Sequence, residues 1–358
     1  MKTTGKRQPE KKAGKLTVAV TGLNNIDSPG PGVAVIRAIR ECKDFDVRII
    51  GLSYESMEPG IYMENVADKT YQIPYPAAGS EPLLQRLEYI HEIEKIDLII
   101  PNFDAELHHF IKLSPTLAKI GIRTFLPSLD QFEARDKTAL FAFGQKNDLL
   151  VPRDRLIHQV HELPGVAQQL SYPLVVKGKF YDAVVAYTFE QAEKAFHKLH
   201  AKWGLPIIVQ EYIKGSEVNV AALGDGKGNM ISAVPMRKLY ITDKGKAWAG
   251  ITIDDTALID MARKFITATK WKGGLEMEIM KTSEGKPYIM EVNPRFPAWI
   301  YLTAGAGQNQ PAALVKMAMG EKVLPYKKFQ AGKIFLRYSW DLLIDVEQFQ
   351  ALSAYGEI

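Results

Sequence analysis

The chain reads Gly273-Gly274-Leu275-Glu276-Met277-Glu278-Ile279 and, after a short turn, Tyr288-Ile289-Met290-Glu291-Val292-Asn293-Pro294-Arg295. Both stretches alternate apolar and polar side chains, which is the pattern of half-buried strands. Residues 282–287 (Thr-Ser-Glu-Gly-Lys-Pro) form a turn between them, so the sequence predicts a β-hairpin. Pairing of the two strands would bring Glu278 beside Glu291, with Asn293 on the same face.

These three side chains offer two carboxylates and one amide oxygen at a single place. Mg²⁺ takes oxygen ligands and usually shares them with substrate phosphates. Pro294 ends the strand directly after Asn293, and Arg295 adds a cation just beyond it. The pattern therefore favours a site for Mg²⁺ held against nucleotide phosphates. The alternative is an ordinary hairpin with solvated acids.

The Glu-x-Asn-Pro-Arg string at residues 291–295 resembles the metal-binding signature of the ATP-grasp superfamily. The resemblance is to its carbamoyl-phosphate-synthase-like and carboxylate–amine ligase branch, and it covers roughly residues 16–325. It implies a mixed α/β and α+β fold, in which a doubly wound parallel sheet, the pre-ATP-grasp domain, precedes a two-lobed ATP-grasp domain. It also implies that Glu278, Glu291 and Asn293 bind the metal.

Short apolar strands alternate with helices in the first third of the chain, which by itself predicts a parallel, doubly wound sheet. We expect strands at 16–21, 46–52, 96–101 and 123–126, and helices at 33–41 and 83–94. A helix over 129–144 then leads into two α+β blocks. The predicted domains are a basic tail (1–15), the N-terminal domain (16–127), the ATP-grasp domain (128–330, with a small lid lobe over about 145–212 and a large lobe over 213–330) and a C-terminal strand extension (331–358).

The composition is that of a soluble globular protein, because 46% of the 358 residues are apolar and 24% are charged. A chain of this length favours two or three domains. No apolar run approaches the roughly 20 residues that span a bilayer, and the N-terminus does not read as a signal peptide. The lone Cys42 excludes an internal disulfide and a multi-cysteine metal site. These features predict a cytoplasmic protein without a membrane partner.

The formal net charge of +4 comes from the N-terminal tail. Residues 1–15 contain six Lys or Arg and one Glu, so the rest of the chain carries a net charge of −1. A basic tail with almost no apolar residues is expected to be disordered, and weak contact of this tail with nucleic acid or membrane is the alternative. The remaining chain has no basic bias, so we do not expect a nucleic-acid-binding protein.

Two lysines match the positions of the family's phosphate-binding lysines. Lys137 follows Asp136 where a helix opens, and Lys177 ends the apolar strand 172–177. A lysine after a buried strand supplies a point charge for a phosphate. A solubilising lysine at the end of a strand is the competing interpretation.

The loop after Lys177 departs from the family pattern. The family has a glycine-rich loop over the triphosphate, because only bare backbone approaches phosphates closely. Residues 178–187 contain a single glycine, and the loop is expected to be shorter. We expect Lys179 to bind ATP and to compensate with its charge, and the closing role of the loop is left open.

Residues 207–217 resemble the segment that joins the two lobes of the family. The resemblance implies that the backbone around Glu211, Tyr212 and Ile213 binds adenine. It also implies that Glu217 accepts hydrogen bonds from the ribose hydroxyls.

Three cations are predicted to be catalytic: Arg295, Lys238 and Arg237. The resemblance places Arg295 at the transferring phosphoryl group or at the oxyanion of a tetrahedral intermediate. Arg237 and Lys238 follow an apolar strand, where they would meet phosphate or an anionic intermediate. An exposed strand edge carries such residues just as often.

Candidate substrate contacts follow from the rule that ligands lie at the carboxyl ends of parallel strands. Asp104 and Glu106 follow one such strand, and residues 22–32 follow another without the G-x-G-x-x-G spacing of a dinucleotide loop. Exposed loops explain these residues equally well. Trp299 is a candidate wall of an acceptor pocket, with a place in the core as the alternative.

The resemblance implies an ATP-dependent carboxylate–amine ligase that uses ATP and Mg²⁺, with Mn²⁺ as a substitute. A carboxylate attacks the γ-phosphate, ADP leaves, and an amine displaces phosphate from the acyl phosphate. The expected partners are a small carboxylate (an amino acid or peptide) and an amine, and a homodimer is compatible with this function. A carboxylase or phosphotransferase on the same fold, or a non-catalytic ATP-binding regulatory module, is the alternative.

Overall fold

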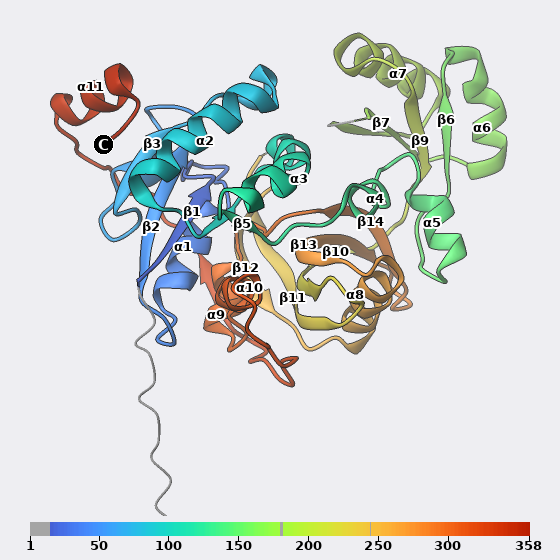
Figure 1. Ribbon diagram of the computed structural model, residues 1–358. Coiled ribbons are helices and arrows are strands. Elements are labelled where there is room, and N and C mark those ends of the chain that lie inside the picture. The colour runs from blue at the N-terminus through green and yellow to red at the C-terminus, as the bar shows by residue number, and fades with distance from the viewer. Residues whose placement is uncertain (1–14, 180–181, 244) are drawn as a thin grey trace, which may run out of the picture.

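The protein is described by a computed structural model that covers residues 15–179, 182–243 and 245–358. All but one residue of the basic tail expected at 1–15 lies outside the described residues. Three sheets organise the chain, and Figure 1 shows the small lobe (green) standing above the large lobe and beside the N-terminal domain (blue). No helix in the described residues is long and apolar enough to cross a membrane.

The N-terminal domain is built on a parallel sheet in the order β3-β2-β1-β4-β5, which confirms the predicted doubly wound arrangement. The carboxyl ends of β1 and β4 lie at the same edge, and the loops that follow them run into the N-termini of α1 and α3. The elements are β1 (Leu16–Thr21), α1 (Gly32–Arg40), β2 (Val47–Ser53), η1 (Pro59–Ile61), β3 (Lys69–Gln72), η2 (Pro76–Ala78), α2 (Ser80–Glu94), β4 (Leu98–Ile100), α3 (Asp104–Lys119) and β5 (Arg123–Thr124).

The small lobe is an antiparallel sheet in the order β6-β9-β7-β8, with two helices packed on it. Its own apolar core includes Leu174, Phe196 and Val209. The elements are β6 (Asp154–Ile157), η3 (Val160–Glu162), α6 (Leu163–Leu170), β7 (Leu174–Lys177), β8 (Ala183–Ala186), α7 (Phe189–Trp203) and β9 (Ile207–Glu211). Because Lys177 pairs with Ala183, part of the expected loop 178–187 is strand, and residues 180 and 181 lie outside the described part.

The large lobe is an antiparallel sheet in the order β14-β13-β10-β11-β12-β15. One face packs against α8 around the fully buried Trp271. The other face of β10 carries Ala221 and Leu223, which share a core with α1 and the N-terminal sheet. The elements are β10 (Ser216–Asp225), β11 (Met230–Ile241), β12 (Ala247–Thr252), α8 (Thr256–Thr269), β13 (Lys272–Lys281), β14 (Pro287–Asn293), α9 (Tyr301–Gly305), α10 (Gln310–Ala318) and β15 (Ile334–Leu336).

The linker from the N-terminal domain breaks where one helix was expected. The prediction of a continuous helix over 129–144 is wrong, because α4 (Leu129–Glu133) and α5 (Leu140–Lys146) are separate. Asp136 Oδ1 accepts a hydrogen bond from the Thr138 backbone N–H at 2.8 Å, which stabilises a turn instead of helix at this point. The break places Arg135 and Lys137 on the wall of a cleft.

The C-terminal extension contacts both the sheet of the large lobe and the sheet of the N-terminal domain. One strand of it, β15, pairs with β12 at the outer edge of the large sheet. After α11 (Val346–Tyr355), the last residues add to the free edge of β3: Gln72 N–H donates to Gly356 O at 2.8 Å, and Ile358 N–H donates to Thr70 O at 3.0 Å. Figure 1 shows α11 (red) beside β3 of the N-terminal domain.

We expect Gly32→Ala to lower the free energy of unfolding by about 1–3 kcal/mol. A Cβ at residue 32 would lie 2.1 Å from the Thr21 carbonyl oxygen, so β1 and α1 would have to separate. Gly165→Ala is the matched control, because a Cβ there meets nothing within 4 Å. Urea unfolding of both variants measures the effect; equal stabilities would contradict this account of the β1–α1 junction.

Candidate active site

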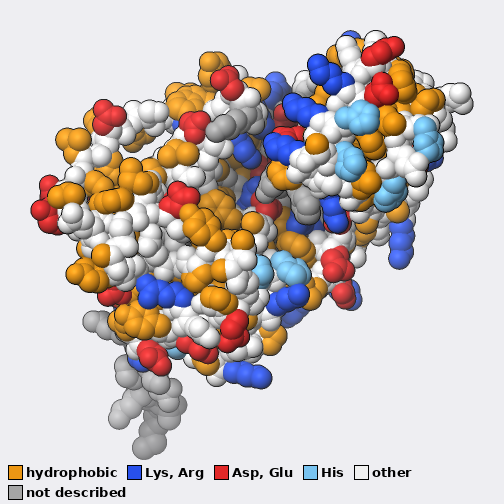
Figure 2. All heavy atoms as spheres, turned by 90° about the horizontal axis from the view of Figure 1, so that it is seen from above, with side chains coloured by type: hydrophobic (Ala, Val, Ile, Leu, Met, Phe, Trp, Pro, Cys, Tyr) orange, Lys and Arg blue, Asp and Glu red, His pale blue; other side chains and the backbone are white. Residues whose placement is uncertain are grey.

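A cleft of about 960 Å³ lies where the N-terminal domain, the linker and both lobes meet. Figure 2 shows basic and acidic side chains gathered along the furrow between the larger body and the smaller lobe. Because side chains alternate along strands, one face of the large sheet supplies most of the acids. The residues of this face that line the cleft are Glu217, Asn219, Lys238, Glu276, Glu278, Glu291 and Asn293.

The predicted metal-binding residues come together as the hairpin requires. Glu278 pairs directly with Glu291 between β13 and β14, and Asn293 Nδ2 donates to Glu278 Oε1 at 3.2 Å. Burial, together with the carboxylates of Glu276 and Glu291, raises the pKa of Glu278 to about 7. Crowded carboxylates of this kind favour a cation.

The donor set fits Mg²⁺, which prefers oxygen ligands. The amide nitrogen of Asn293 faces Glu278, and turning this amide over would present Oδ1 to the same point. No group of three or more His, Cys, Asp or Glu side chains suited to a metal occurs among the described residues. The role of Asn293 as a third protein ligand stays a prediction.

Lysines from the linker and the small lobe face these carboxylates. Lys137 Nζ lies 3.2 Å from Glu291 Oε1. Burial and the nearby charge of Lys137 lower the pKa of Lys177 to about 8, although Glu291, Glu278 and Asp154 oppose the shift. Lys179 also lines the cleft. The three lysines predicted to bind ATP therefore line the same cleft.

Lys238 and Arg237 lie on opposite faces of β11. Lys238 lines the cleft, forms an ion pair with Glu217 and donates to Gly245 O at 3.1 Å. Arg237 is exposed on the other face and is not among the cleft-lining residues. Of these two neighbouring cations, the structure brings only Lys238 to the cleft.

Arg295 connects the N-terminal domain to the large lobe, because it pairs with Asp104 of α3 and with Glu276 of β13. Its Nε lies 3.1 Å from Asp104 Oδ2, and its Nη1 lies 3.1 Å from Glu276 Oε2. Glu276 also accepts from Trp299 Nε1 at 2.8 Å and from Asn219 Nδ2 at 3.0 Å. Neither Glu276 nor Asn219 is among the site residues predicted from the sequence, although Glu276 precedes Glu278 by two residues and therefore shares its face.

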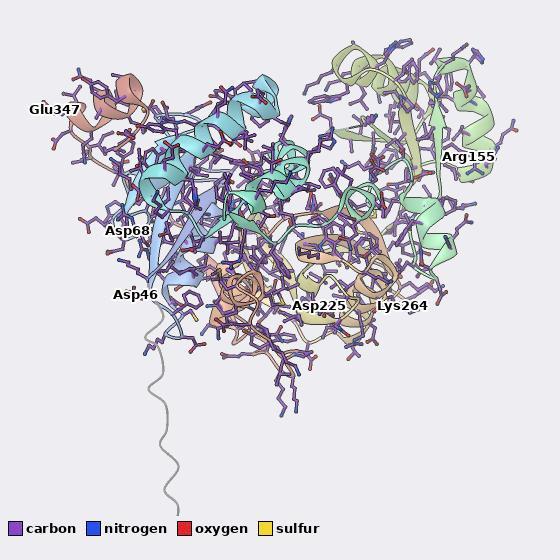
Figure 3. The ribbon with its side chains drawn as sticks, viewed as in Figure 1. Asp46, Asp68, Arg155, Asp225, Lys264 and Glu347 are labelled. Carbon is purple, nitrogen blue, oxygen red and sulfur yellow. The ribbon has the colours of Figure 1, made fainter. Side chains whose placement is uncertain are left out.

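We expect Glu276→Ala to lower the free energy of unfolding by about 3–5 kcal/mol. The substitution leaves the Arg295 guanidinium, whose side chain is 12% exposed, without one of its two carboxylates. Glu347→Ala at the outer end of α11 is the control (Figure 3) and should stay within about 0.5 kcal/mol of the parent. Chemical denaturation tests both, and a stable Glu276→Ala protein would contradict the structural importance of this network.

Glu106 does not reach the cleft, which corrects its assignment as a substrate contact. Its carboxylate is fully buried inside the N-terminal domain, where it accepts from the Thr21 and Tyr54 hydroxyls and from the backbone N–H groups of Asn102 and Phe103. Such a carboxylate caps the N-terminus of α3. Asp104, by contrast, lines the cleft.

The predicted adenine-binding segment lies between β9 and β10, at the junction of the two lobes. Glu211, Tyr212 and Ile213 are not among the residues that line the cleft. The Glu211 carboxylate pairs with Arg153 Nε at 3.0 Å, and its backbone N–H donates to Arg153 O at 2.8 Å. Backbone contacts from this segment to adenine therefore stay a prediction.

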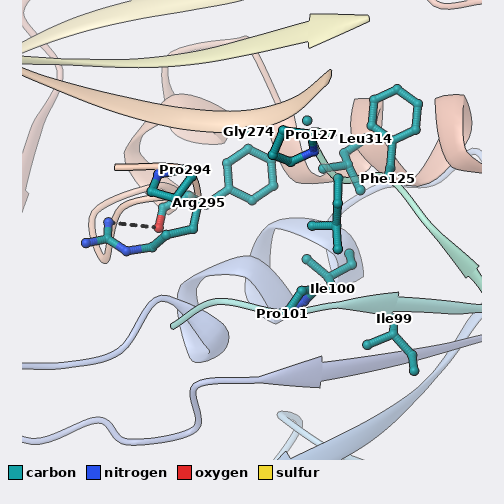
Figure 4. Close-up of a pocket in the computed structure, with 12 residues that line it drawn as sticks. Ile99, Ile100, Pro101, Phe125, Pro127, Gly274, Pro294, Arg295 and Leu314 are labelled. Atoms are coloured by element: carbon teal, nitrogen blue, oxygen red, sulfur yellow. Dashed lines mark hydrogen bonds between the residues drawn. The ribbon is translucent and has the colours of Figure 1, made fainter. Parts of the chain in front are cut away.

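Trp299 lines the cleft, but it is only 5% exposed and its Nε1 donates to Glu276. Trp299 therefore also packs in the core shared by the large lobe and the N-terminal domain. Phe296 is buried in the shared core, at the edge of a small apolar pocket of about 20 Å³ (Figure 4). In that view Arg295 turns away from the apolar walls and donates to Phe296 O at 3.4 Å. The pocket has room for one water molecule and none for a substrate.

Two further arginines, neither of them predicted from the sequence, reach the cleft. Arg135 comes from the break between α4 and α5, and Arg337 follows β15 and donates through Nε to Ala247 O at 2.9 Å. Burial lowers the pKa of Arg337 to about 10. Local sequence patterns do not reveal either position, because each depends on contacts with distant segments.

Comparison with known proteins finds a family model that matches part of the chain. Residues 205–337 match the family described as ATP-grasp in the biosynthetic pathway with Ter operon. The chain is 22% identical over 273 residues to a carbamoyl phosphate synthase large chain from Agathobacter rectalis, covering 72% of this chain and 25% of that protein. The chain thus spans about a quarter of the length of the curated relatives that it matches.

Solved structures share the fold across most of the chain. A biotin carboxylase from Campylobacter jejuni, in a β,γ-ATP complex, superposes with a TM-score of 0.68 at 17% identity, covering 88% of this chain and 73% of that one. An L-amino acid ligase from Bacillus licheniformis gives a TM-score of 0.64 at 18% identity, covering 85% and 74%. Residues 205–337 thus match an ATP-grasp family, and most of the chain shares its fold with these two solved structures.

Proposed function

We propose that the protein is an ATP-dependent, ADP-forming carboxylate–amine ligase. The observation that carries this proposal is the pairing of Glu278 with Glu291 on a cleft that Lys137 and Lys177 also face. Two crowded carboxylates opposite two lysines match the charge pattern of Mg²⁺ and a triphosphate.

Each side chain has a part in the proposed reaction. Glu278, Glu291 and Asn293 would hold Mg²⁺, which when bound neutralises phosphate charge and orients the transferring group. Lys137 and Lys177 bind phosphates as point charges, while Lys179 and Glu217 complete the nucleotide site. Arg295, fixed by two carboxylates, stabilises the negative charge that develops on the transferring phosphoryl group.

The chemistry joins two small molecules through an acyl phosphate. A substrate carboxylate oxygen attacks the γ-phosphorus and ADP leaves with the bridging oxygen. The amine then forms a bond to the acyl carbon, inorganic phosphate leaves, and the nitrogen loses its proton. The protein contributes orientation and charge stabilisation, with the lobes holding both substrates in a single cleft.

ADP release from Mg·ATP, with amino acids and short peptides offered in pools, tests the proposal. We expect ADP formation that depends on substrate, with one amide produced for each ADP. AMP with pyrophosphate would contradict the acyl-phosphate route, and a carboxylated or phosphorylated product would assign the fold to a different reaction. ATP binding without turnover in any pool would support a regulatory module instead.

A further inference from the structure

Among the described residues, four that line the cleft have a buried polar atom without a hydrogen-bond partner. The atoms are Asn102 Oδ1, Asp104 Oδ1, Asn219 Oδ1 and Arg135 Nε. Buried polar atoms are nearly always paired in native proteins. Asn102 is fully buried and its Nδ2 donates to Thr21 O and Ile100 O inside the N-terminal domain. The other three atoms indicate which groups a ligand would bring to this part of the cleft: hydrogen-bond donors for the Asp104 and Asn219 oxygens and an acceptor for the guanidinium.

The orphaned oxygens of Asp104 and Asn219 lie at the two ends of one network. Asn219 Nδ2 donates to Glu276 Oε1, and Arg295 bridges Glu276 Oε2 to Asp104 Oδ2. The Glu276 carboxylate can only accept when it is ionised, so it fixes the Asn219 amide with Nδ2 toward itself and Oδ1 away from it. No side chain of this network donates a hydrogen bond to Asp104 Oδ1 or to Asn219 Oδ1.

Arg135 is held by stacking instead of by hydrogen bonds. Its guanidinium carbon lies 4.1 Å from the centre of the Phe132 ring, and within the described residues no hydrogen bond from Arg135 is found. A guanidinium stacked on a ring keeps its in-plane N–H groups available for a planar anion. Arg135 lines the same cleft as Asp104 and Asn219. Burial lowers the pKa of Arg135, while the nearby charges of Asp104 and Glu291 oppose this shift.

We propose that this part of the cleft is the binding subsite for a free α-amino acid. Arg135 binds the α-carboxylate, and the orphaned oxygens of Asp104 and Asn219 accept hydrogen bonds from the α-ammonium group. The inference rests on the proposed ligase function and names the class of one of its substrates. A phosphate group or a dicarboxylate without an amine satisfies Arg135 but leaves both oxygens unpaired, and a zwitterion satisfies all three atoms.

The first experiment uses the wild-type protein with saturating Mg·ADP. Isothermal titration calorimetry with the twenty L-amino acids, taken one at a time, is expected to identify at least one that binds. Its α-amide and its N-acetyl derivative are each expected to bind at least about 10-fold more weakly, because each removes one charge of the zwitterion. Equal affinity for the acid and the amide, or no binding of any amino acid, would overturn the inference.

Variants locate the two charges. Arg135→Gln is expected to bind the amino acid at least about 10-fold more weakly and to stop distinguishing the acid from its amide, while Arg135→Lys restores part of the preference. Arg155→Gln, at the outer edge of the small lobe (Figure 3), is the matched control and should bind as the parent does. Unchanged discrimination in Arg135→Gln would overturn the assignment of this residue.

ADP release is measured separately from amino acid binding. A failure of the proposed ligase function can then be distinguished from a failure of the proposed subsite. Amino acid binding with the predicted charge preference, but without ADP release, would support the subsite and contradict the ligase function. ADP release with substrates that lack an amino or carboxylate charge, unaffected in Arg135→Gln, would support the ligase function and overturn the subsite. The melting temperature and the affinity for Mg·ADP confirm that each variant is folded.

Discussion

Glu291→Gln is expected to reduce substrate-dependent ADP formation by about 100-fold or more. Glu291 faces Glu278 directly across the hairpin and its Oε1 lies 3.2 Å from Lys137 Nζ. The substitution therefore removes the charge of a proposed metal ligand and of the ion-pair partner of a proposed phosphate-binding lysine. Initial rates of ADP release at saturating Mg·ATP measure the loss. The residual activity should require a higher Mg²⁺ concentration, because one charged ligand is missing.

Glu284→Gln is the matched control for this substitution. Glu284 lies in the turn of the same hairpin with its side chain 72% exposed, so the parent activity should be retained. An active Glu291→Gln enzyme with an unchanged Mg²⁺ requirement would contradict the assignment of Glu291 as a metal ligand.

Lys177→Met is expected to lower kcat/KM for ATP by about 100-fold and, in the absence of nucleotide, to raise the melting temperature. The first effect follows from the loss of a charge at the phosphates. The second follows because burial and the charge of Lys137 lower the pKa of Lys177 from 10.5 to about 8. The charged ammonium of Lys177 therefore destabilises the folded protein. Removal of that cost at pH 7 should contribute about 1–3 kcal/mol.

The destabilisation of the folded protein by Lys177 depends on pH. Below pH 8, Lys177 is charged in both the folded and the unfolded chain, and the full cost is present. Between pH 8 and 10.5 only the unfolded chain keeps the proton, so the cost disappears and the free energy of unfolding rises with pH. Lys177→Met should lack this rise.

Lys264→Met is the control for Lys177→Met, because Lys264 pairs with Asp148 on the outside of the large lobe (Figure 3). It should change neither kcat/KM nor the slope of stability against pH. A Lys177→Met protein that binds Mg·ATP as the parent does would contradict the role of this lysine.

The hairpin at the centre of the site could be predicted from sequence because its contacts are local. Strand alternation and the turn at 282–287 together determine that Glu278 faces Glu291, and the structure confirms this register. The same alternation could have identified Glu276, which lies two residues before Glu278. It could also have shown that Arg237 and Lys238, as neighbours on a strand, cannot both reach the cleft.

The remaining differences depend on contacts that no local pattern shows. Asp104 and Glu106 both stand at the start of α3, and only packing decides that Glu106 turns inward to Thr21 and Tyr54. The break at 134–139 contains neither Pro nor Gly, so propensity gave no reason to expect it. Arg337 reaches the cleft only because β15 pairs with β12 from a distance of more than 80 residues.

Transfer of oxygen from the substrate tests the acyl-phosphate reaction most directly. The amino acid or peptide that supports ADP release is labelled with ¹⁸O in its carboxylate, and the phosphate produced is examined by ³¹P NMR. Our account predicts one ¹⁸O atom in each inorganic phosphate, because the carboxylate oxygen that attacks the γ-phosphorus leaves with it. Unlabelled phosphate, formed at the same rate as the amide, would contradict the proposed mechanism.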